Sequence, residues 1–255
     1  MADNNIIIRN VKVVTPTGDS ARRGSSMSEL SVTGDASIVI TDGIITYVGP
    51  SDDIRIVADV DYNILEGDGN VALPGFVDSH THLIFGGFRP DEFEWRLKGD
   101  SYMSIMERGG GIQSTVNATR EESLDALVEK ARWFVDRMVE MGVTTVEAKS
   151  GYGLDTESEI KMLDAIDTIA RDENTPLSVV ATFLGAHAVP REYKGRTSEY
   201  IDLMIREMLP AVKGKAEFCD IFTEKNVFEI EDSRRFLTAA REAGFKLKLH
   251  ADEIV

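Results

Sequence analysis

The pattern of hydrophobic positions changes near residue 72. Before it, apolar residues come in short β-branched runs separated by turn signals such as Asp42-Gly43, a pattern typical of strands and hairpins. The three runs are NIIIRNVKVV, ASIVITDGIITYVG and RIVADVDYNILEG. The Gly/Ser-rich stretch TGDSARRGSSMSELSVTGD, between the first two runs, is expected to be a loop. Residues 1–72 are therefore predicted to form a small all-β part.

From residue 73 to residue 255, strand-like and helix-like stretches alternate. Strands are expected over GFVDSHTHLIF, which we interpret as buried, and over VTTVEAK, LSVVATFLG, AEFCDIFTE and KLKLHADEIV, the last running to the end. Helices are expected over EESLDALVEKARWFVDRMVEMG, DTESEIKMLDAIDTIAR, TSEYIDLMIREMLPAV and EIEDSRRFLTAAREAG. Pro210 should end or kink the third helix. Between the first strand and the first helix we expect a long loop with ERGGGIQSTVNATR at its centre.

This alternation predicts an α/β fold, with helices packed on a parallel sheet. A doubly wound sheet that binds a dinucleotide needs clustered glycines directly after the first strand, where this chain has DSHTHLIFGG, so we favour a (β/α)8 TIM-type barrel. Only about five β/α units are present, and five strands cannot close such a barrel. The barrel domain over residues 73–255 is therefore expected to be truncated at its C-terminus, in a sequence that is part of a longer protein.

Charge and cysteine content narrow the class of partner. The formal net charge is −16, which makes nucleic acid and anionic membrane surfaces poor partners and points to a small molecule. No apolar run approaches the ~18 residues of a membrane span, and the start MADNNIIIRNVKVV does not resemble a signal peptide. The single cysteine, Cys219, suits a reducing compartment, so we expect a cytoplasmic location.

The four histidines all fall at or just beyond the C-terminal ends of predicted strands. They are His80, His82, His187 and His250. Side chains two apart on a strand point to the same face, so His80 and His82 should project together. Two imidazoles at the catalytic end of a barrel make half of a zinc or iron site, although a lone histidine is more often a satisfied core residue.

A metal ion at this edge would polarise a carbonyl and lower the pKa of a bound water, and a nearby carboxylate could then move the proton. Three acids lie close to the histidines in sequence. Asp78 should point inward and orient a ligand, whereas Asp252 is interpreted as a solvated charge. Glu253, the third of these acids, directly follows Asp252.

Two further side chains are candidates for substrate binding. Arg89, in GGFRPDEF, could clamp a carboxylate, or it could form a surface ion pair with Asp91 or Glu92. Tyr152, in KSGYGLD, has glycines on both sides that leave the backbone free to present its ring to a pocket, although an ordinary loop tyrosine would have the same pattern.

Three other features receive less specific readings. Lys149 ends a predicted strand and could in principle bridge two metals as a carbamate. Cys219 lies within a strand and is interpreted as core packing. The glycines at 109–111 are not followed by Gly-Lys-Ser/Thr, so they indicate a flexible loop or lid rather than a phosphate-binding loop.

Several stretches are similar to a known family. PGFVDSHTHLIFGGFR resembles the first strand of the amidohydrolase superfamily, and within it RGGGIQSTVNATR, EAKSGYGLD, ATFLGAHAVPREYKG, FCDIFTEKNVF and KLKLHADE together resemble the imidazolonepropionase family. The resemblance runs over almost all 255 residues. Its HxH motif is shared by many hydrolases, whereas KSGYGL together with LGAHAVP is more specific.

The resemblance implies hydrolysis of the ring C–N bond of 4-imidazolone-5-propanoate to N-formimidoyl-L-glutamate in histidine degradation, with one zinc or iron ion. The matching positions are His80, His82 and His250 for the metal, and Arg89, Tyr152, His187 and Glu253 for the substrate. Glu253 and His187 are also implied to act in catalysis, Glu253 by handling protons and His187 as a hydrogen-bond donor.

The resemblance also implies a possible homodimer, and it implies that residues 1–72 form part of a composite β-sandwich domain. The family's remaining metal ligand, an Asp, and a later active-site histidine fall outside residues 1–255. Two other hypotheses stay open: an aminohydrolase (deaminase) acting on a purine or pyrimidine ring, and a non-catalytic barrel fragment.

Overall fold

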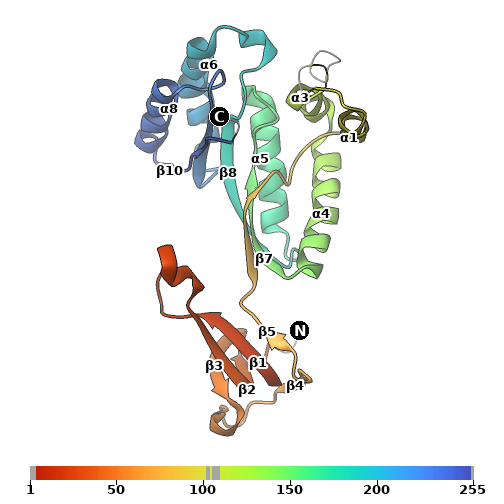
Figure 1. Ribbon diagram of the computed structural model, residues 1–255, viewed down its shortest axis with the longest axis vertical. Coiled ribbons are helices and arrows are strands. Elements are labelled where there is room, and N and C mark those ends of the chain that lie inside the picture. The colour runs from red at the N-terminus through yellow and green to blue at the C-terminus, as the bar shows by residue number, and fades with distance from the viewer. Residues whose placement is uncertain (1–3, 102–103, 105–109, 254–255) are drawn as a thin grey trace. The chain divides into compact units, whose positions relative to one another are not determined.

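The computed structural model describes residues 4–101, 104 and 110–253. The chain divides into two compact units, Met1–Gly75 and Phe76–Val255 (Figure 1). This boundary lies three residues beyond the one expected from the hydrophobic pattern. Each unit has a sheet and a buried cluster of its own.

The first unit is a small mixed sheet with the strand order β3-β2-β1-β4, with β5 also on β1. Its strands are β1 (Ile6–Pro16), β2 (Leu30–Thr41), β3 (Ile44–Pro50), β4 (Asn63–Glu66) and β5 (Val71–Ala72). Strands β1 to β3 are antiparallel, whereas β4 and β5 run parallel to β1. Asp42 (φ 51°) and Gly43 (φ 77°) turn β2 into β3, as a two-residue hairpin turn requires.

The expected loop between the first two β runs is partly wrong. Its last six residues, from Leu30, already belong to β2 and pair with β1, for example Thr33 opposite Val13. Their side chains are mostly exposed, so this part of the strand is stabilised by backbone pairing and leaves little apolar signal in the sequence.

The second unit is a wholly parallel sheet with helices between its strands, which confirms the expected α/β class. The strands are β6 (Phe76–Thr81), β7 (Val143–Lys149), β8 (Ser178–Ala186), β9 (Phe218–Thr223), β10 (Lys246–Leu247) and β11 (His250–Ala251). Their order is β10-β9-β8-β7-β6, and β11 also pairs with β9. The last expected strand is therefore interrupted between β10 and β11 rather than continuous.

Strand β6 is not the buried strand that its apolar run suggested. It lies at one edge of the sheet, and its Phe76 and Val77 are 53% and 65% exposed. Hydrophobicity alone does not separate a central strand from an edge strand, because both can present long apolar side chains.

The helices are α1 (Pro90–Leu97), α3 (Ile112–Glu121), α4 (Leu124–Glu140), α5 (Thr156–Arg171), α6 (Thr197–Leu203), α7 (Leu209–Val212) and α8 (Ile230–Glu242). The expected long loop after the first strand is wrong over α1 and α3. Gly109 lies outside the described residues, and Gly111 caps the start of α3, so the described part of the glycine run begins a helix.

Local signals set the other helix boundaries. The side chain of Ser123 caps α4 and that of Asp155 caps α5, each by accepting a backbone N–H three residues on. A π-helical turn over Met204–Met208 separates α6 from α7 just before Pro210. Proline has no N–H to donate to the carbonyl four residues earlier, so the wider turn is the form that the expected kink takes.

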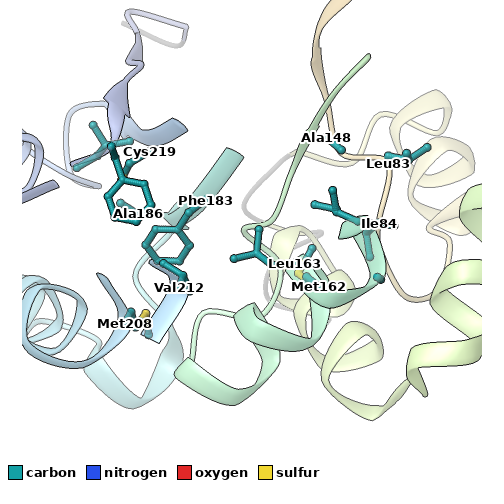
Figure 2. Close-up of a cluster of buried hydrophobic side chains, with 14 of the residues drawn as sticks. Leu83, Ile84, Ala148, Met162, Leu163, Phe183, Ala186, Met208, Val212 and Cys219 are labelled. Atoms are coloured by element: carbon teal, nitrogen blue, oxygen red, sulfur yellow. The ribbon is translucent and has the colours of Figure 1, made fainter. Parts of the chain in front are cut away.

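The main core lies between the parallel sheet and its helices (Figure 2). Phe183 and Ala186 from β8 and Cys219 from β9 pack with Met208 and Val212 from the helices, and all are essentially inaccessible. Cys219 makes the core contact that we expected, and burial raises the pKa of its thiol. Among the described residues, no helix is long and apolar enough to cross a membrane.

Candidate active site

The four histidines come from three separate stretches of the sequence and converge at the C-terminal ends of the parallel strands. The ring centroids of His80 and His82 are 6.0 Å apart, and those of His80 and His250 are 5.2 Å apart. His187, directly after β8, stacks on His82 at 4.6 Å and lies 6.2 Å from His250. The ends of three strands, β6, β8 and β11, therefore bring one cluster of imidazoles together.

Burial lowers the pKa of three imidazoles in this cluster, those of His80, His82 and His187. It lowers the pKa of His187 to about 4, against which a hydrogen bond to Gly151 acts only partly. The pKa of His82 is lowered well below its usual value, first by burial and then by neighbouring histidines. The pKa of His80 is lowered in the same way, with Lys149 as the next cause. At neutral pH these rings are lone-pair donors, the form in which histidine binds metals.

His250 is oriented by a buried carboxylate. Its Nδ1 lies 3.1 Å from Oδ2 of Asp220, and because a carboxylate only accepts, Nδ1 carries a proton, so that the neutral ring would have its lone pair on Nε2. The same Oδ2 lies 2.7 Å from Nζ of Lys149. Glu147 is the second carboxylate beside Lys149. Its Oε2 lies 2.9 Å from Nζ of Lys149, and its Oε1 lies 2.5 Å from Nζ of Lys248. Lys149 is thus a buried ammonium between two carboxylates, which argues against the carbamate considered for it.

Tyr152 stands in a short loop between β7 and α5, defined here as residues 150–154 and called the Tyr152 loop. Its ring centroid is 4.7 Å from that of His82 and 5.2 Å from that of His187. Nδ1 of His187 lies 2.9 Å from the carbonyl oxygen of Gly151. Nδ1 must donate to this acceptor, so in the neutral ring Nε2 accepts, in contrast to the donor role expected for His187.

A cavity of about 230 Å³ opens beside these rings. It is lined by His82, Phe85, Gly87, Phe88, Arg89, Thr115 and Tyr152. Nη1 of Arg89 lies 3.4 Å from Oε2 of Glu92, so the ion pair considered as an alternative is present at the rim of this cavity. The other oxygen of Glu92 accepts the N–H of Gly111 at 2.7 Å. Among the described residues, the Arg89 guanidinium is therefore held at the cavity by one long ion-pair contact.

The three acids that lie next to the histidines in the sequence face the backbone or the solvent. Asp78 accepts the backbone N–H of His80 at 3.5 Å, so its visible contact is with the strand rather than with an imidazole ring. Asp252 is exposed, in agreement with its reading as a solvated charge. Glu253 is also exposed, and its backbone N–H donates to Oε2 of Glu224 at 3.1 Å.

The donor set suits a divalent ion such as zinc, although its rings are not gathered around one point. Within residues 4–101, 104 and 110–253, no three His, Cys, Asp or Glu side chains are arranged closely enough to hold a metal ion. The lowered pKa values of His80 and His82 nevertheless favour their neutral, lone-pair-donating form, and among the described residues Nδ1 of His82 is buried without a hydrogen-bond partner. His250 has the carboxylate partner typical of a metal-binding histidine.

Sequence reasoning missed the buried partners of this site. Asp220, in FCDIFT, is an acid inside an apolar strand, and Lys149 ends another strand. Each of these two apolar runs contains one charged residue, and the two charges are opposite. That was the signal from which their pairing could have been predicted. Glu159, whose carboxylate receives the N–H groups of the Tyr152 loop, sits on a helix face among ordinary helix formers and gives no such signal.

No family model matches the chain. It is 58% identical over 255 residues to the imidazolonepropionase of Phocaeicola vulgatus, an alignment that covers 99% of this chain and 61% of that protein. It is 48% identical over 259 residues to the imidazolonepropionase of Clostridium tetani, covering 100% of this chain and 61% of the other. The chain thus spans about 61% of the length of these curated relatives.

Solved structures share the fold at low identity. Klebsiella pneumoniae 5-methylcytosine deaminase liganded with 5-fluorocytosine matches with a TM-score of 0.62 at 16% identity, covering 98% of this chain and 52% of that one. A mutant of atrazine chlorohydrolase from Arthrobacter aurescens, complexed with zinc and atraton, matches with a TM-score of 0.51 at 17% identity, covering 96% and 52%. These matches confirm the expected barrel type. Over nearly its whole length the chain is similar in sequence to curated imidazolonepropionases, and its parallel half-barrel sheet with helices has the fold of these solved structures.

Proposed function

We propose that the protein opens the ring of 4-imidazolone-5-propanoate with water to give N-formimidoyl-L-glutamate. The observation that supports this most is the convergence of four imidazoles beside a cavity that Arg89 and Tyr152 also line. The identity to curated imidazolonepropionases supports the choice of substrate over that of a deaminase.

In this proposal, His80, His82 and His250 hold one zinc or iron ion. When bound, such an ion polarises the ring carbonyl and supplies a water of lowered pKa. Asp220 keeps the proton of His250 on Nδ1, so that Nε2 faces the ion as a lone-pair donor. Neutral His82 and His80 need lose no proton to bind, because burial has already lowered their pKa values.

In the same proposal, the substrate is held by groups in and around the cavity. The propanoate carboxylate binds the guanidinium of Arg89. The bidentate ion pair that these two groups would form is stronger than the 3.4 Å contact of Arg89 with Glu92. The Tyr152 hydroxyl donates to a ring acceptor, and Nε2 of His187 accepts a ring N–H. Glu253, exposed at the end of β11, moves the proton from water to the leaving nitrogen.

Arg89→Ala tests the substrate. The anionic imidazolone should lose the carboxylate contact, and kcat/KM should fall about 10- to 100-fold, as for other charged hydrogen bonds. Arg96→Ala, which changes an exposed arginine on helix α1 directly after Arg89, is the matched control and should leave kcat/KM unchanged. Full activity of Arg89→Ala on a neutral aminopurine or aminopyrimidine, with none on the imidazolone in the parent, would favour a deaminase instead.

His80→Ala tests the metal. The variant should lose bound zinc or iron and lose turnover, while its circular dichroism stays unchanged, because His80 lies on an edge strand and is not part of the hydrophobic core. Full activity without His80 would contradict its role as a ligand. A homodimer and a cytoplasmic location accompany the proposal, and sedimentation and cell fractionation would test them.

A further inference from the structure

We propose that Glu159 is a positioning residue, whose buried carboxylate holds the Tyr152 loop in the form that presents Tyr152 and His187 to the cavity. This inference rests on the proposed function, because it takes Tyr152 and His187 as substrate contacts. Glu159 touches neither the cavity nor the histidines in this arrangement. Its effect on the reaction passes through the backbone of the loop.

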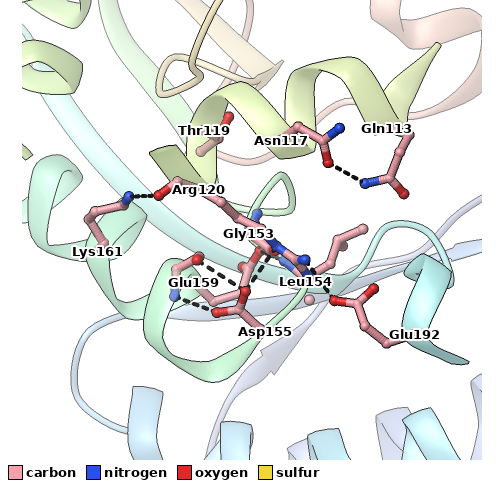
Figure 3. A network of polar contacts seen from close by, with 12 residues as sticks. Gln113, Asn117, Thr119, Arg120, Gly153, Leu154, Asp155, Glu159, Lys161 and Glu192 are labelled. Atoms are coloured by element: carbon pink, nitrogen blue, oxygen red, sulfur yellow. Dashed lines mark hydrogen bonds and ion pairs between the residues drawn. The ribbon is translucent and has the colours of Figure 1, made fainter. Parts of the chain in front are cut away.

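The carboxylate of Glu159 is completely buried and surrounded by hydrogen-bond donors. Oε1 accepts the N–H of Gly153 at 2.8 Å and that of Leu154 at 2.9 Å, and both oxygens lie 3.1 Å from the N–H of Gly151 (Figure 3). The Ser150 side chain adds a further hydrogen bond. Burial raises the pKa of Glu159, whereas the hydrogen bonds from Ser150 and from the three backbone N–H groups act in the opposite direction and favour the carboxylate.

The loop that Glu159 holds is in a conformation that it would not keep alone. Leu154, a bulky and buried residue, has a φ of 55°, in the left-handed region that such residues avoid. Gly151 has a φ of 111°. A Cβ on Gly153 would lie 2.5 Å from the backbone N of Glu159, so the loop and the first turn of α5 are in close contact. Strained backbone of this kind persists only where its surroundings fix it.

One peptide segment links Glu159 to the site. The N–H of Gly151 is bound by Glu159, and the carbonyl of the same residue receives Nδ1 of His187 at 2.9 Å. Tyr152 follows directly, with its ring against those of His82 and His187. If the hydrogen bonds to Glu159 are weakened, the Gly151 carbonyl can move. The tautomer of His187 and the position of the Tyr152 ring are then no longer fixed.

Arg120 fastens the loop from the opposite side. Its Nε lies 2.7 Å from the carbonyl oxygen of Gly153, and its Nη1 lies 2.6 Å from Oε1 of Glu192 (Figure 3). The N–H and C=O groups of Gly153 are thus both occupied, the first by Glu159 and the second by Arg120. The loop is bound by side chains from α5 and α3, and the backbone has little freedom left.

Glu159→Gln is the test, with Glu157→Gln as the matched control. Gln keeps the shape of Glu159 but turns one acceptor into a donor that faces the N–H of Gly151. Glu157 is an exposed acid in the same first turn of α5, so its change alters the helix terminus equally without touching the loop. The readouts are amide hydrogen exchange at Gly151, Gly153 and Leu154, the ¹⁵N shifts of the His187 ring, and KM and kcat on 4-imidazolone-5-propanoate.

In Glu159→Gln we expect exchange at the three amides to speed up about tenfold or more, as for loss of a buried acceptor. The His187 ring should change from one Nδ1–H tautomer to a mixture, and KM should rise more than kcat falls. Glu157→Gln should match the parent. If Glu159→Gln does not fold, Ser150→Ala removes a single donor to Glu159 and should change the same signals in the same direction, by less.

Parent-like exchange and one His187 tautomer in Glu159→Gln would overturn the inference, as would a loosened loop with KM and kcat unchanged. A parent protein without ring-opening activity would sink the proposed function alone. The exchange and tautomer measurements would still decide whether Glu159 holds the loop.

Discussion

Nζ of Lys149 lies 2.7 Å from Oδ2 of Asp220, and both side chains are only 1% exposed. The two residues come from β7 and β9, so the pair crosses the intervening strand β8. Burial alone would raise the pKa of Asp220, but hydrogen bonds from His250 and Lys149 and the charge of Lys149 lower it to about 2. Lys149 thereby keeps Asp220 ionised, and Asp220 keeps the proton of His250 on Nδ1.

The first prediction concerns metal affinity. Asp220→Asn keeps an oxygen near His250 but removes the negative charge that fixes its tautomer. We expect the affinity for zinc, measured by competition with a chelator, to fall about 10- to 100-fold, as for other carboxylate partners of metal-binding histidines. Asp202→Asn removes an exposed acid and serves as the control. Equal zinc affinity in Asp220→Asn and the parent would show that His250 needs no such partner.

The second prediction concerns stability. Lys149→Met leaves Asp220 and Glu147 as two buried carboxylates without their shared cation, so the free energy of unfolding in urea should fall on the order of 3–5 kcal/mol. Lys215→Met breaks the partly exposed pair with Asp164 and should cost under about 1 kcal/mol. If both variants lost the same small amount, the buried group would not be the stabilising network described above.

The third prediction concerns pH. Burial lowers the pKa of His187 from about 6.5 in the unfolded chain to about 4 in the folded one. Between pH 6.5 and pH 4, His187 is therefore protonated in the unfolded chain but neutral in the folded one. The free energy of unfolding consequently falls as the pH falls. Between pH 7 and pH 5 this amounts to about 2 kcal/mol.

His187→Asn checks this, because Asn can still donate to the carbonyl of Gly151 but does not titrate. Urea unfolding at both pH values should show a loss from pH 7 to pH 5 that is about 2 kcal/mol smaller in the variant than in the parent. His82, also buried with a lowered pKa, leaves a remaining slope in both proteins. Identical slopes would mean that His187 is already protonated, or solvated, in the folded protein.

The fourth prediction separates substrate from metal. Tyr152→Phe removes the hydroxyl and keeps the ring against His82 and His187, so KM should rise about 2- to 10-fold, the worth of one neutral hydrogen bond. Zinc affinity should stay the same. Equal losses of substrate and metal binding would indicate that Tyr152 supports the site only structurally.

The parallel α/β architecture and the convergence of the histidines could be predicted from the sequence, because both depend on periodic features. Alternating strands and helices impose a parallel sheet, and residues at the carboxyl ends of its strands must lie at one edge. The sequence alone therefore predicts that His187 and His250 lie near His80. The Ser123 and Asp155 caps likewise leave short, local signals.

Features that depend on distant pairing escaped prediction. The helices α1 and α3 lie in a stretch whose glycines and polar residues resemble a loop, and their stabilising contacts come from elsewhere: the Thr119 hydroxyl, for example, binds the N–H of Gly86 at 2.8 Å. Asp220 shows no distinctive spacing from His250 in sequence, since their strands meet only in the fold. The exposure of β6 depends on its place at the edge of the sheet, which its own residues do not reveal.

The burial of Cys219 has a practical consequence for spectroscopy. It is the sole cysteine in the sequence, it is wholly enclosed between β9 and the packed helices, and its raised pKa leaves almost no thiolate to attack a maleimide. A second thiol engineered at an exposed position, such as Glu157→Cys at the start of α5, would therefore take up a fluorophore or spin label selectively in the folded chain. Movements beside the Tyr152 loop could then be followed from a single reporter, with the native sulfur left in place.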